Sequence, residues 1–535
     1  MRAPQRLHGG LARCAAAALA LLAAAGCASH DPRDPNTLVI LEAADAGQIE
    51  PLLTSQYYSF LYQNLIFDVL VGTGKDYAPV PQLATSWHAN KAGTVWTLEL
   101  RHNARWSDGQ PVTSADVVWT YEALIDPKTG SPYQGQDAYV KDAVALGPYR
   151  VRIDLKQPNA TFMNSVLQSQ WIMPEHLFRG VSHAQIRTTN FGENPVGSGP
   201  YKLVRWNHDQ ECLMAANPYW WGGTPRVKAV DVRIVLNPQA GLDAMLQGTG
   251  DVIDGLGPET QRRLREDPNL SVMSIPDLYT AFIYLNYHVK GLDDVAVRRA
   301  MLYGWDRDGV TRGLEHASVT VANGVEPAAL TYWHNDKVKP YPYDPSRARA
   351  LLDAAGWRPG RDGIRRKGNV RLAFELKEPG GGGGGIGQDI AAEFQADMRA
   401  VGIEIDNHLL DYATFIDQLQ SSNFQLAYSG WGGSPDPDQY TLLDSSQIPP
   451  NGNNVGFYRN PAVDRDLRQG LKALDDAKRK TYYDDMQVRV AADVPLLFLY
   501  NQTDTVGVNR RVHIAGPLMP GLYLFTNVMQ WRLDP

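Results

Sequence analysis

Alternating apolar and polar positions predict a half-buried strand over residues 96–101, which read WTLELR. The turn dipeptide Asp108-Gly109 follows, and Thr113 or Ser114 then provides a suitable cap for a helix. These residues contain no arrangement typical of a catalytic site. The stretch therefore predicts a structural unit of strand, turn and helix.

The second half of the chain alternates between strand patterns and helix patterns. Strands are expected at residues 370–376, 403–405 and 424–428, and apolar residues have helical spacing at 390–401 and 415–419. This β-α-β-α-β order predicts an open α/β sheet with parallel strands. In such sheets, ligands bind beyond the carboxyl ends of the strands.

Two unusual loops follow the first and third of these strands. Residues 380–385 are six glycines, and residues 430–438 read GWGGSPDPD. A glycine loop before a helix lets backbone N–H groups approach an acceptor, and an indole between glycines presents its face to a cleft. The alternatives are a flexible low-complexity loop and a core tryptophan. The ligand-binding residues predicted in these loops are Gly382, Gly383, Trp431, Gly432, Gly433, Ser434 and Asp436.

The first 26 residues have the composition of a signal peptide. Three arginines precede an apolar run at residues 15–25, which is too short to span a bilayer. Small residues stand directly before Cys27, as in a lipoprotein processing site, so we predict lipidation of Cys27 and a tether over residues 27–36. Ordinary cleavage with an incidental Cys27 is the alternative. Either way, the chain is expected outside the cytoplasm, in the periplasm, and a lipid would anchor it to the membrane.

Composition excludes several classes of protein. Residues 1–26 hold three Arg and no acidic residue, so the remaining chain has 48 Lys and Arg against 58 Asp and Glu. A net charge of −10 argues against a nucleic-acid partner. The three cysteines form no metal-binding cluster, and the 12 histidines are scattered. We therefore predict no metal, no cofactor and no catalytic residue.

Six ordered blocks of the sequence resemble the large solute-binding proteins of oligopeptide and dipeptide ABC importers, the peptide/nickel type of family 5. The blocks are residues 96–118, 194–201 with 217–225, 281–308, 343–357, 401–405 with 430–438, and 479–500. The resemblance implies an α/β, two-lobed periplasmic-binding-protein fold of class II, the large peptide-binding type, with a hinge between the lobes.

The family fold also implies lobe boundaries. Lobe I would hold residues 37–285 and 503–535, with a subdomain at about 75–205, and lobe II would hold residues 286–502. The lobes would close about strands near 284–287 and 496–500, which makes Tyr284 and Asn286 candidate ligand contacts. Ala44, in the loop after the first predicted strand, is a further candidate.

The implied function is capture of a solute in the cleft and its delivery to a permease and ATPase complex by a monomeric binding protein. Dipeptide-binding members carry a carboxylate three residues after the tryptophan, where this chain has Ser434, and an arginine where it has polyglycine. Asp436 is a possible substitute for the carboxylate. We therefore expect an oligopeptide rather than a strict dipeptide binder.

Three alternatives stay open at this stage. A neutral solute such as an oligosaccharide would stack on Trp431 as readily as a peptide would pack there. An enzyme is disfavoured because no nucleophile or metal motif is present. A sensor or chaperone that keeps the fold without a permease is the third.

Overall fold

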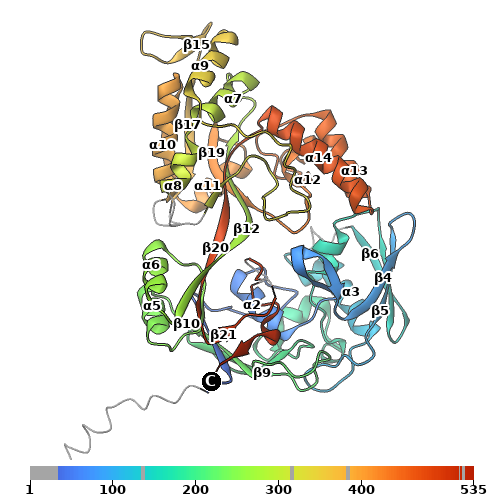
Figure 1. Cartoon of the computed structure of the whole chain (residues 1–535). Coiled ribbons are helices and arrows are strands. Elements are labelled where there is room, and N and C mark those ends of the chain that lie inside the picture. Colours follow the sequence, from blue (N-terminus) through green and yellow to red (C-terminus); the bar gives the residue numbers. More distant parts are fainter. Residues whose placement is uncertain are drawn as a thin grey trace, which may run out of the picture.

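The computed structural model describes most of the chain. The described residues are 34–133, 139–313, 319–380, 386–516, 518–520 and 524–534. The predicted signal peptide, Cys27, most of the tether, Gly382 and Gly383 lie outside them. Two lobes, one above the other in Figure 1, share one 11-stranded mixed sheet.

The sheet has the order β18-β17-β19-β12-β20-β11-β1-β10-β9-β8, with β13 beside β20. Its lobe I strands are β1 (Thr37–Glu42), β8 (Tyr201–Asn207), β9 (Glu211–Ala216), β10 (Ala229–Ile234) and β11 (Val252–Ile253). Its lobe II strands are β13 (Val319–Val321), β17 (Ala373–Pro379), β18 (Glu404–Leu410) and β19 (Leu426–Gly432). Two strands, β12 (Leu270–Leu285) and β20 (Leu496–Asn509), run through both lobes.

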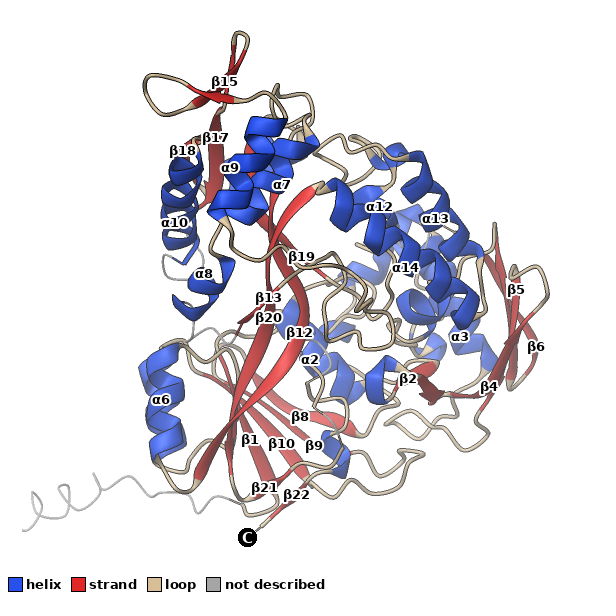
Figure 2. Cartoon of the chain, turned by 45° about the horizontal axis from the view of Figure 1, so that its top comes forward, coloured by secondary structure: helices blue, strands red, loops and turns tan. Residues whose placement is uncertain are grey.

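Helices cover both faces of the lobe II sheet, as Figure 2 shows. They are α7 (Val295–Gly304), α8 (Arg307–Gly313), α9 (Pro345–Ala354), α10 (Ile386–Val401), α11 (Tyr412–Gln420), α12 (Tyr440–Leu443), α13 (Pro461–Lys472) and α14 (Asp476–Asp493). Successive residues of β12 point to opposite faces. Ile283 and Leu285 join the core under α7, α9 and α10, while Phe282 and Tyr284 join the core under α13 and α14.

The predicted β-α-β-α-β unit is confirmed. Strand β17 pairs in parallel with β18 on one side and with β19 on the other, and α10 and α11 connect them. In lobe I, β1 likewise pairs in parallel with β10 and β11. Parallel strands run in the same direction and are joined by crossover connections. In each of these two groups of strands, all the carboxyl ends therefore lie at one edge of the sheet.

Lobe I carries a subdomain built on a separate sheet of order β4-β5-β7-β6. Its strands are β4 (Ala84–Ala89), β5 (Val95–Leu100), β6 (Val140–Gly147) and β7 (Arg150–Leu155), and α3 (Ser114–Ile125) packs on β6. Thr113 caps α3 in a capping box with Asp116, whose Oδ2 accepts from the Thr113 N–H at 2.7 Å. The strand, turn and helix predicted for residues 96–118 are therefore present.

The remaining elements of lobe I surround this frame. They include α2 (Tyr57–Ile66), α5 (Pro238–Leu246), α6 (Pro258–Glu266), β2 (Val71–Thr73), β3 (Pro79–Pro81), β21 (Val512–His513) and β22 (Arg532–Leu533). Two short strands of lobe II, β14 (Arg358–Pro359) and β16 (Val370–Arg371), pair with β15 (Arg365–Lys367). No helix among the described residues is both long enough and apolar enough to cross a membrane.

The chain crosses between the lobes where the pairing of β12 with β20 breaks. Residues 270–276 pair with 503–509, the register shifts, and pairing resumes from Thr280 opposite Asn501. From Tyr279 onward, β12 also pairs with β19 of lobe II. The crossing on β12 therefore lies before the expected boundary at 285/286, because hydrogen bonds to β19 commit that end of the strand to lobe II.

Candidate binding site at the strand ends between the lobes

Two carboxylates stand side by side at the strand ends of lobe I. Leu41 of β1 pairs with Ile253 of β11 in parallel register. The next residue on β1 is Glu42 and the next after β11 is Asp254. Strand pairing alone therefore brings these two acids together at the edge that faces lobe II.

Glu42 is buried without a partner. Its side chain is 2% exposed, and neither carboxylate oxygen has a hydrogen-bond partner among the described residues. Burial foremost, and then the charge of Asp254, raises the pKa of Glu42 well above its ordinary value. Burial also raises the pKa of Asp254 to about 6, even though the Tyr57 hydroxyl donates to its Oδ2 at 3.0 Å.

Two tyrosines at the start of α2 complete this group. The rings of Tyr57 and Tyr58 meet edge to face, with centroids 5.3 Å apart. Burial and the negative charges of Asp254 and Glu42 raise the pKa of both phenols. We call Glu42, Asp254, Tyr57 and Tyr58 the lobe I acid cluster.

Negative charge continues from the cluster to the crossing strands. Asp504 on β20 raises the pKa of Asp254 and also that of Asp277 on β12, although burial is the larger cause for both. Asp277 reaches a pKa of about 6. An acidic wall therefore runs from the end of β1 to the place where the chain passes into lobe II.

Lobe II contributes tyrosines and one more acid. The hydroxyls of Tyr428 on β19 and Tyr500 on β20 are 3.3 Å apart. Glu378, near the end of β17, is 4% exposed, its Oε2 has no hydrogen-bond partner in the described chain, and its charge helps to raise the pKa of Tyr428. Tyr279 lies directly over Gly430, where an added Cβ would be 2.0 Å from the phenolic oxygen. Residue 430 must therefore be glycine for Tyr279 to keep this position.

The predicted residues of the loop after β19 lie near this wall, but not all of them are exposed to a solute. Trp431 is half-buried on β19, opposite Thr280, and packs against the apolar core that contains Phe282. The Gly433 N–H donates to the Leu278 carbonyl at 2.9 Å. Gly432 and Ser434 are exposed, and Ala44 is partly exposed beside Glu42.

Asp436 departs from its predicted role as an anchor for a solute amino group. Both of its oxygens accept hydrogen bonds from Arg479, each at 2.6 Å, and the two side chains are almost fully buried in lobe II. Asp436 Oδ1 also accepts from the Asp438 N–H at 3.0 Å. Asp436 therefore holds the loop in place and, being buried, is not accessible to a solute.

Tyr284 and Asn286 lie inside lobe II rather than at the crossing. Tyr284 is 4% exposed in the apolar core. The Asn286 amide donates to the Phe424 carbonyl at 2.8 Å, and its oxygen accepts from the His288 N–H. These contacts give Asn286 a structural role, so neither residue is positioned to line the space between the lobes.

Sequence reasoning missed several residues of this wall. Asp254 follows a strand of two residues, which is too short to show any periodicity. Tyr279 and Asp277 sit where the register of β12 breaks, a feature that depends on pairing with β20. Glu378 was detectable, since it directly precedes the glycine run at the end of a predicted strand.

Comparison with known proteins now identifies the fold. The family model of bacterial extracellular solute-binding proteins, family 5 (middle region), matches residues 78–454, more than half of the chain. The chain belongs to this family. The resemblance and the two-lobed α/β fold predicted from sequence are thus confirmed, as is the expectation of a binding protein rather than an enzyme.

Relatives of this family 5 protein have varied cargo. It is 27% identical over 481 residues to the oligopeptide-binding protein AppA of Bacillus subtilis, which covers 88% of this chain and 87% of AppA. The structure of that AppA with a nonapeptide has a TM-score of 0.73 at 23% identity and covers 93% of this chain and 99% of AppA. NikZ of Campylobacter jejuni, solved with Ni(L-His), has a TM-score of 0.75 at 25% identity and covers 93% and 100%.

Among the described residues of the family 5 protein, the lobes also touch outside the crossing strands. The Ala160 N–H of lobe I donates to the Leu471 carbonyl at the end of α13, at 2.7 Å. Tyr77 and Met519 of lobe I form a small apolar cluster with Leu278 and with Leu330 of lobe II. The two lobes therefore make direct contacts in addition to sharing the crossing strands.

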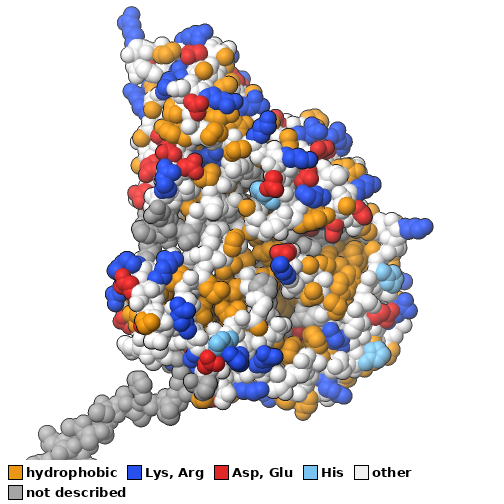
Figure 3. Space-filling view, in the orientation of Figure 1, with side chains coloured by type: hydrophobic (Ala, Val, Ile, Leu, Met, Phe, Trp, Pro, Cys, Tyr) orange, Lys and Arg blue, Asp and Glu red, His pale blue; other side chains and the backbone are white. Residues whose placement is uncertain are grey.

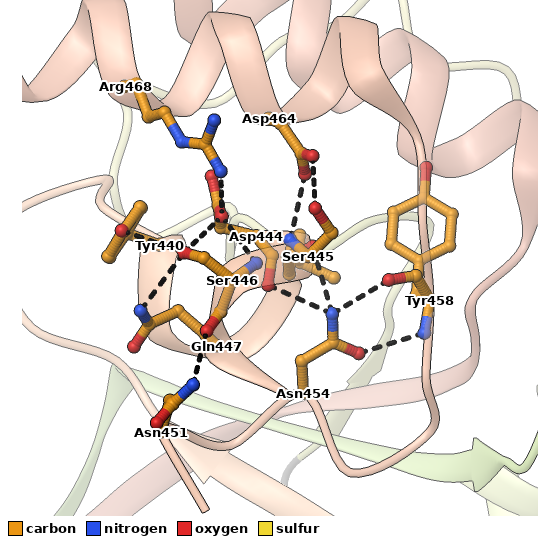
Figure 4. Close-up of polar contacts among 11 residues, drawn as sticks. Tyr440, Asp444, Ser445, Ser446, Gln447, Asn451, Asn454, Tyr458, Asp464 and Arg468 are labelled. Carbon is orange, nitrogen blue, oxygen red and sulfur yellow. Dashed lines mark hydrogen bonds and ion pairs between the residues drawn. The ribbon is translucent and has the colours of Figure 1, made fainter. Parts of the chain in front are cut away.

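A hydrogen-bond network holds the loop that follows β19 (Figure 4). Arg468 of α13 donates to Asp444 Oδ1 at 2.6 Å, and the Ser446 N–H donates to the same oxygen. The Asn454 amide donates to the Tyr458 and Asp444 carbonyls, while Asp464 accepts from the Ser445 N–H. The segment from Asp444 to Tyr458 is thus tied to α13.

A separate cavity of about 690 Å³ lies within lobe I. Trp171, Trp220, Trp221 and Met519 are among its lining residues, and none of the acidic wall residues is. The space-filling view shows the face of the lower lobe hollowed, with hydrophobic side chains gathered on the walls (Figure 3). Aromatic surface is therefore available for solute side chains in lobe I in addition to the acidic wall.

Proposed function

We propose that this family 5 protein is the solute-binding component of an ABC importer and that it captures an oligopeptide between its lobes. The observation that carries the proposal is the kinship to AppA, named an oligopeptide-binding protein, over 88% of the chain. The absence of a carboxylate at Ser434 and the burial of Asp436 against Arg479 support a solute longer than a dipeptide. Such a solute is held through its backbone and side chains rather than at both charged ends.

The mechanism follows from the two crossing strands. The lobes move about the break in the pairing of β12 with β20, between Pro276 and Thr280. Solute contacts made by both lobes stabilise the closed form, because only that form brings the two walls together. The closed monomer is then recognised by the permease, which receives the solute.

Titration of the purified protein with peptides of two to nine residues tests this function. Tryptophan fluorescence and calorimetry should give micromolar or tighter dissociation constants for longer peptides and weaker ones for dipeptides. Oligosaccharides and nickel–histidine serve as the non-peptide arms. Tight binding of a sugar or of nickel–histidine with no peptide binding would overturn the peptide assignment. Tight binding of dipeptides alone would contradict the inferred solute length.

A nickel cargo has little support in the described chain. No group of three or more His, Cys, Asp or Glu among the described residues is arranged to hold a metal ion. Peptide remains the better proposal for this protein, and the nickel–histidine arm decides between them.

We propose that the protein works in the periplasm as a lipoprotein anchored through Cys27. The small residues before Cys27 and the apolar run at residues 15–25 support export and lipidation. Expression of Cys27→Ser in a Gram-negative host should release the protein from the membrane fraction. The lipid anchor would be refuted if the Cys27→Ser variant stays in the membrane fraction and a palmitate probe does not label the wild type.

A further inference from the structure

Glu42 poses a problem that the rest of the protein does not solve. Its carboxyl group is buried, and neither oxygen is hydrogen-bonded within the described chain. An unmet buried polar group is expensive, and an unmet buried charge is more so. Protonation does not remove the problem, because a neutral carboxyl still has a hydroxyl to donate and a carbonyl that needs a donor.

No cation of the described chain pairs with the carboxylates of the cluster. Among the described residues, no lysine, arginine or histidine forms an ion pair with Glu42, Asp254 or Asp277. The groups whose charges act on Glu42 and Asp254 are themselves acids. Residues 134–138, 314–318, 381–385, 517 and 521–523 contain no lysine or arginine and one histidine, His316. From residue 34 onward, the sequence therefore has no undescribed lysine or arginine to fill this role.

The acid cluster is also open to the space between the lobes. The Tyr57 side chain is 36% exposed, and its hydroxyl already orients one oxygen of Asp254. The cluster occupies the carboxyl ends of β1 and β11, which is where ligands enter parallel sheets. A group arriving from the cleft would meet two adjacent carboxylates flanked by two aromatic rings.

We propose that Glu42 and Asp254 form a subsite for a cationic group of the solute, either an ammonium or a guanidinium, with the Tyr57 and Tyr58 rings beside it. Both groups carry several N–H donors and positive charge, which both acids require. Tyrosine faces add favourable contact with a cation. The inference rests on the proposed capture of a solute between the lobes, and it specifies which solutes are selected. Peptides with a free amino terminus, lysine or arginine fit this description.

Charge-matched peptides test the subsite. The probes are a pentapeptide of alanines with a free amino terminus, its N-acetylated form, and N-acetylated forms with lysine or norleucine at the centre. Calorimetry with the wild type should give about 10- to 100-fold tighter binding for at least one cationic probe than for its neutral match. Glu42→Gln should remove that difference, and so should Asp254→Asn.

Glu50→Gln is the matched control. Glu50 is a buried glutamate of the same lobe with an oxygen that lacks a hydrogen-bond partner, yet it does not act on the charges of the cluster. This variant should keep the full preference for the cationic probe. Circular dichroism and thermal melting verify that all three variants fold.

Either of two results with the peptide probes would overturn the subsite. One is equal binding of cationic and neutral probes by the wild type, and the other is a preference that survives both Glu42→Gln and Asp254→Asn. Free arginine and spermidine are two further probes. They are cationic but are not peptides, so they test the subsite separately from the peptide assignment. One outcome is that arginine and spermidine bind the wild type, bind Glu42→Gln more weakly, and no peptide binds. In that case the subsite stands and the peptide function fails. If no cationic probe binds at all, the subsite itself fails.

Discussion

Two groups of carboxylates, one in each lobe, are satisfied in different ways. In lobe II, Asp436 receives two hydrogen bonds from Arg479, and Asp444 receives one from Arg468. In lobe I, Glu42 has no partner and Asp254 has one neutral phenol. Asp436 and Asp444 therefore maintain the architecture of lobe II, whereas the carboxylates of the lobe I acid cluster have no cationic partner in the described chain.

This difference separates residues that look alike in the sequence. Asp436 and Asp254 both lie beyond the end of a strand. Removing one partner of a buried ion pair leaves an uncompensated charge, while removing an unpartnered acid removes a penalty. Opposite effects on stability are therefore expected from the same type of substitution.

The largest expected effect is on lobe II. Asp436→Asn should lower the free energy of unfolding by about 3–5 kcal/mol, because Arg479 is left buried without its counter-charge. Urea denaturation followed by circular dichroism measures this loss. Replacing both partners, as Asp436→Leu with Arg479→Met, should recover much of it. A loss below about 1 kcal/mol in the single variant would mean that this ion pair contributes no more to stability than an ordinary surface contact.

Asp254→Asn should raise the free energy of unfolding, and the size of this gain should depend on pH. The folded-state pKa of Asp254 is raised from 3.8 to about 6. Between these values the folded protein binds more protons than the unfolded chain, so this group makes stability fall as pH rises through that window. The full penalty is reached above about pH 6 and amounts to about 3 kcal/mol.

Unfolding of the unliganded variant at pH 4 and pH 7 measures this contribution. Relative to the wild type, Asp254→Asn should be more stable at pH 7 and nearly equal at pH 4. Asp142→Asn, the same substitution at an exposed position of β6, should change little at either pH. A variant that is less stable than the wild type at pH 7 would mean that Asp254 is a structural acid like those of lobe II.

Trp431→Ala should have an intermediate effect, on affinity more than on stability. The indole is half-buried beside the wall, so its truncation removes contact area with a solute along with some packing on the core. We expect about tenfold weaker peptide binding and a fold that survives. A collapse of thermal stability in the unliganded variant would assign Trp431 to the core instead.

Tyr57→Phe should have the smallest effect. It removes the hydrogen bond to Asp254 Oδ2, which favours the charged carboxylate, and leaves the ring in place. The pKa of Asp254 should rise further, and the affinity for a cationic peptide at pH 7 should fall about threefold. An unchanged affinity would indicate that the hydrogen bond from the Tyr57 phenol does not help Asp254 to bind a cationic solute.

Much of the frame was predictable from sequence, while the chemistry of the wall was largely not. The periodicity of residues 370–428 predicts three parallel strands, and the glycine run after the first of them marks a strand end. The pairing of Asp436 with Arg479 could not be read, because 43 residues separate them and only the packing of α14 brings them together. The meeting of Glu42 with Asp254 depends on a two-residue strand, for which no pattern exists.

The route of the chain through the two lobes has a consequence for when each can fold. Lobe II between the crossings is one continuous segment, so all its strands can assemble as soon as it is synthesised. Lobe I cannot do so, because β11 and the first half of β12 both need β20, which is more than 200 residues further along. Until residues 503–509 emerge, the lobe I sheet lacks a central strand, and contacts across such a separation form slowly. A nascent chain therefore keeps lobe I incomplete for most of its synthesis, while lobe II is already able to form.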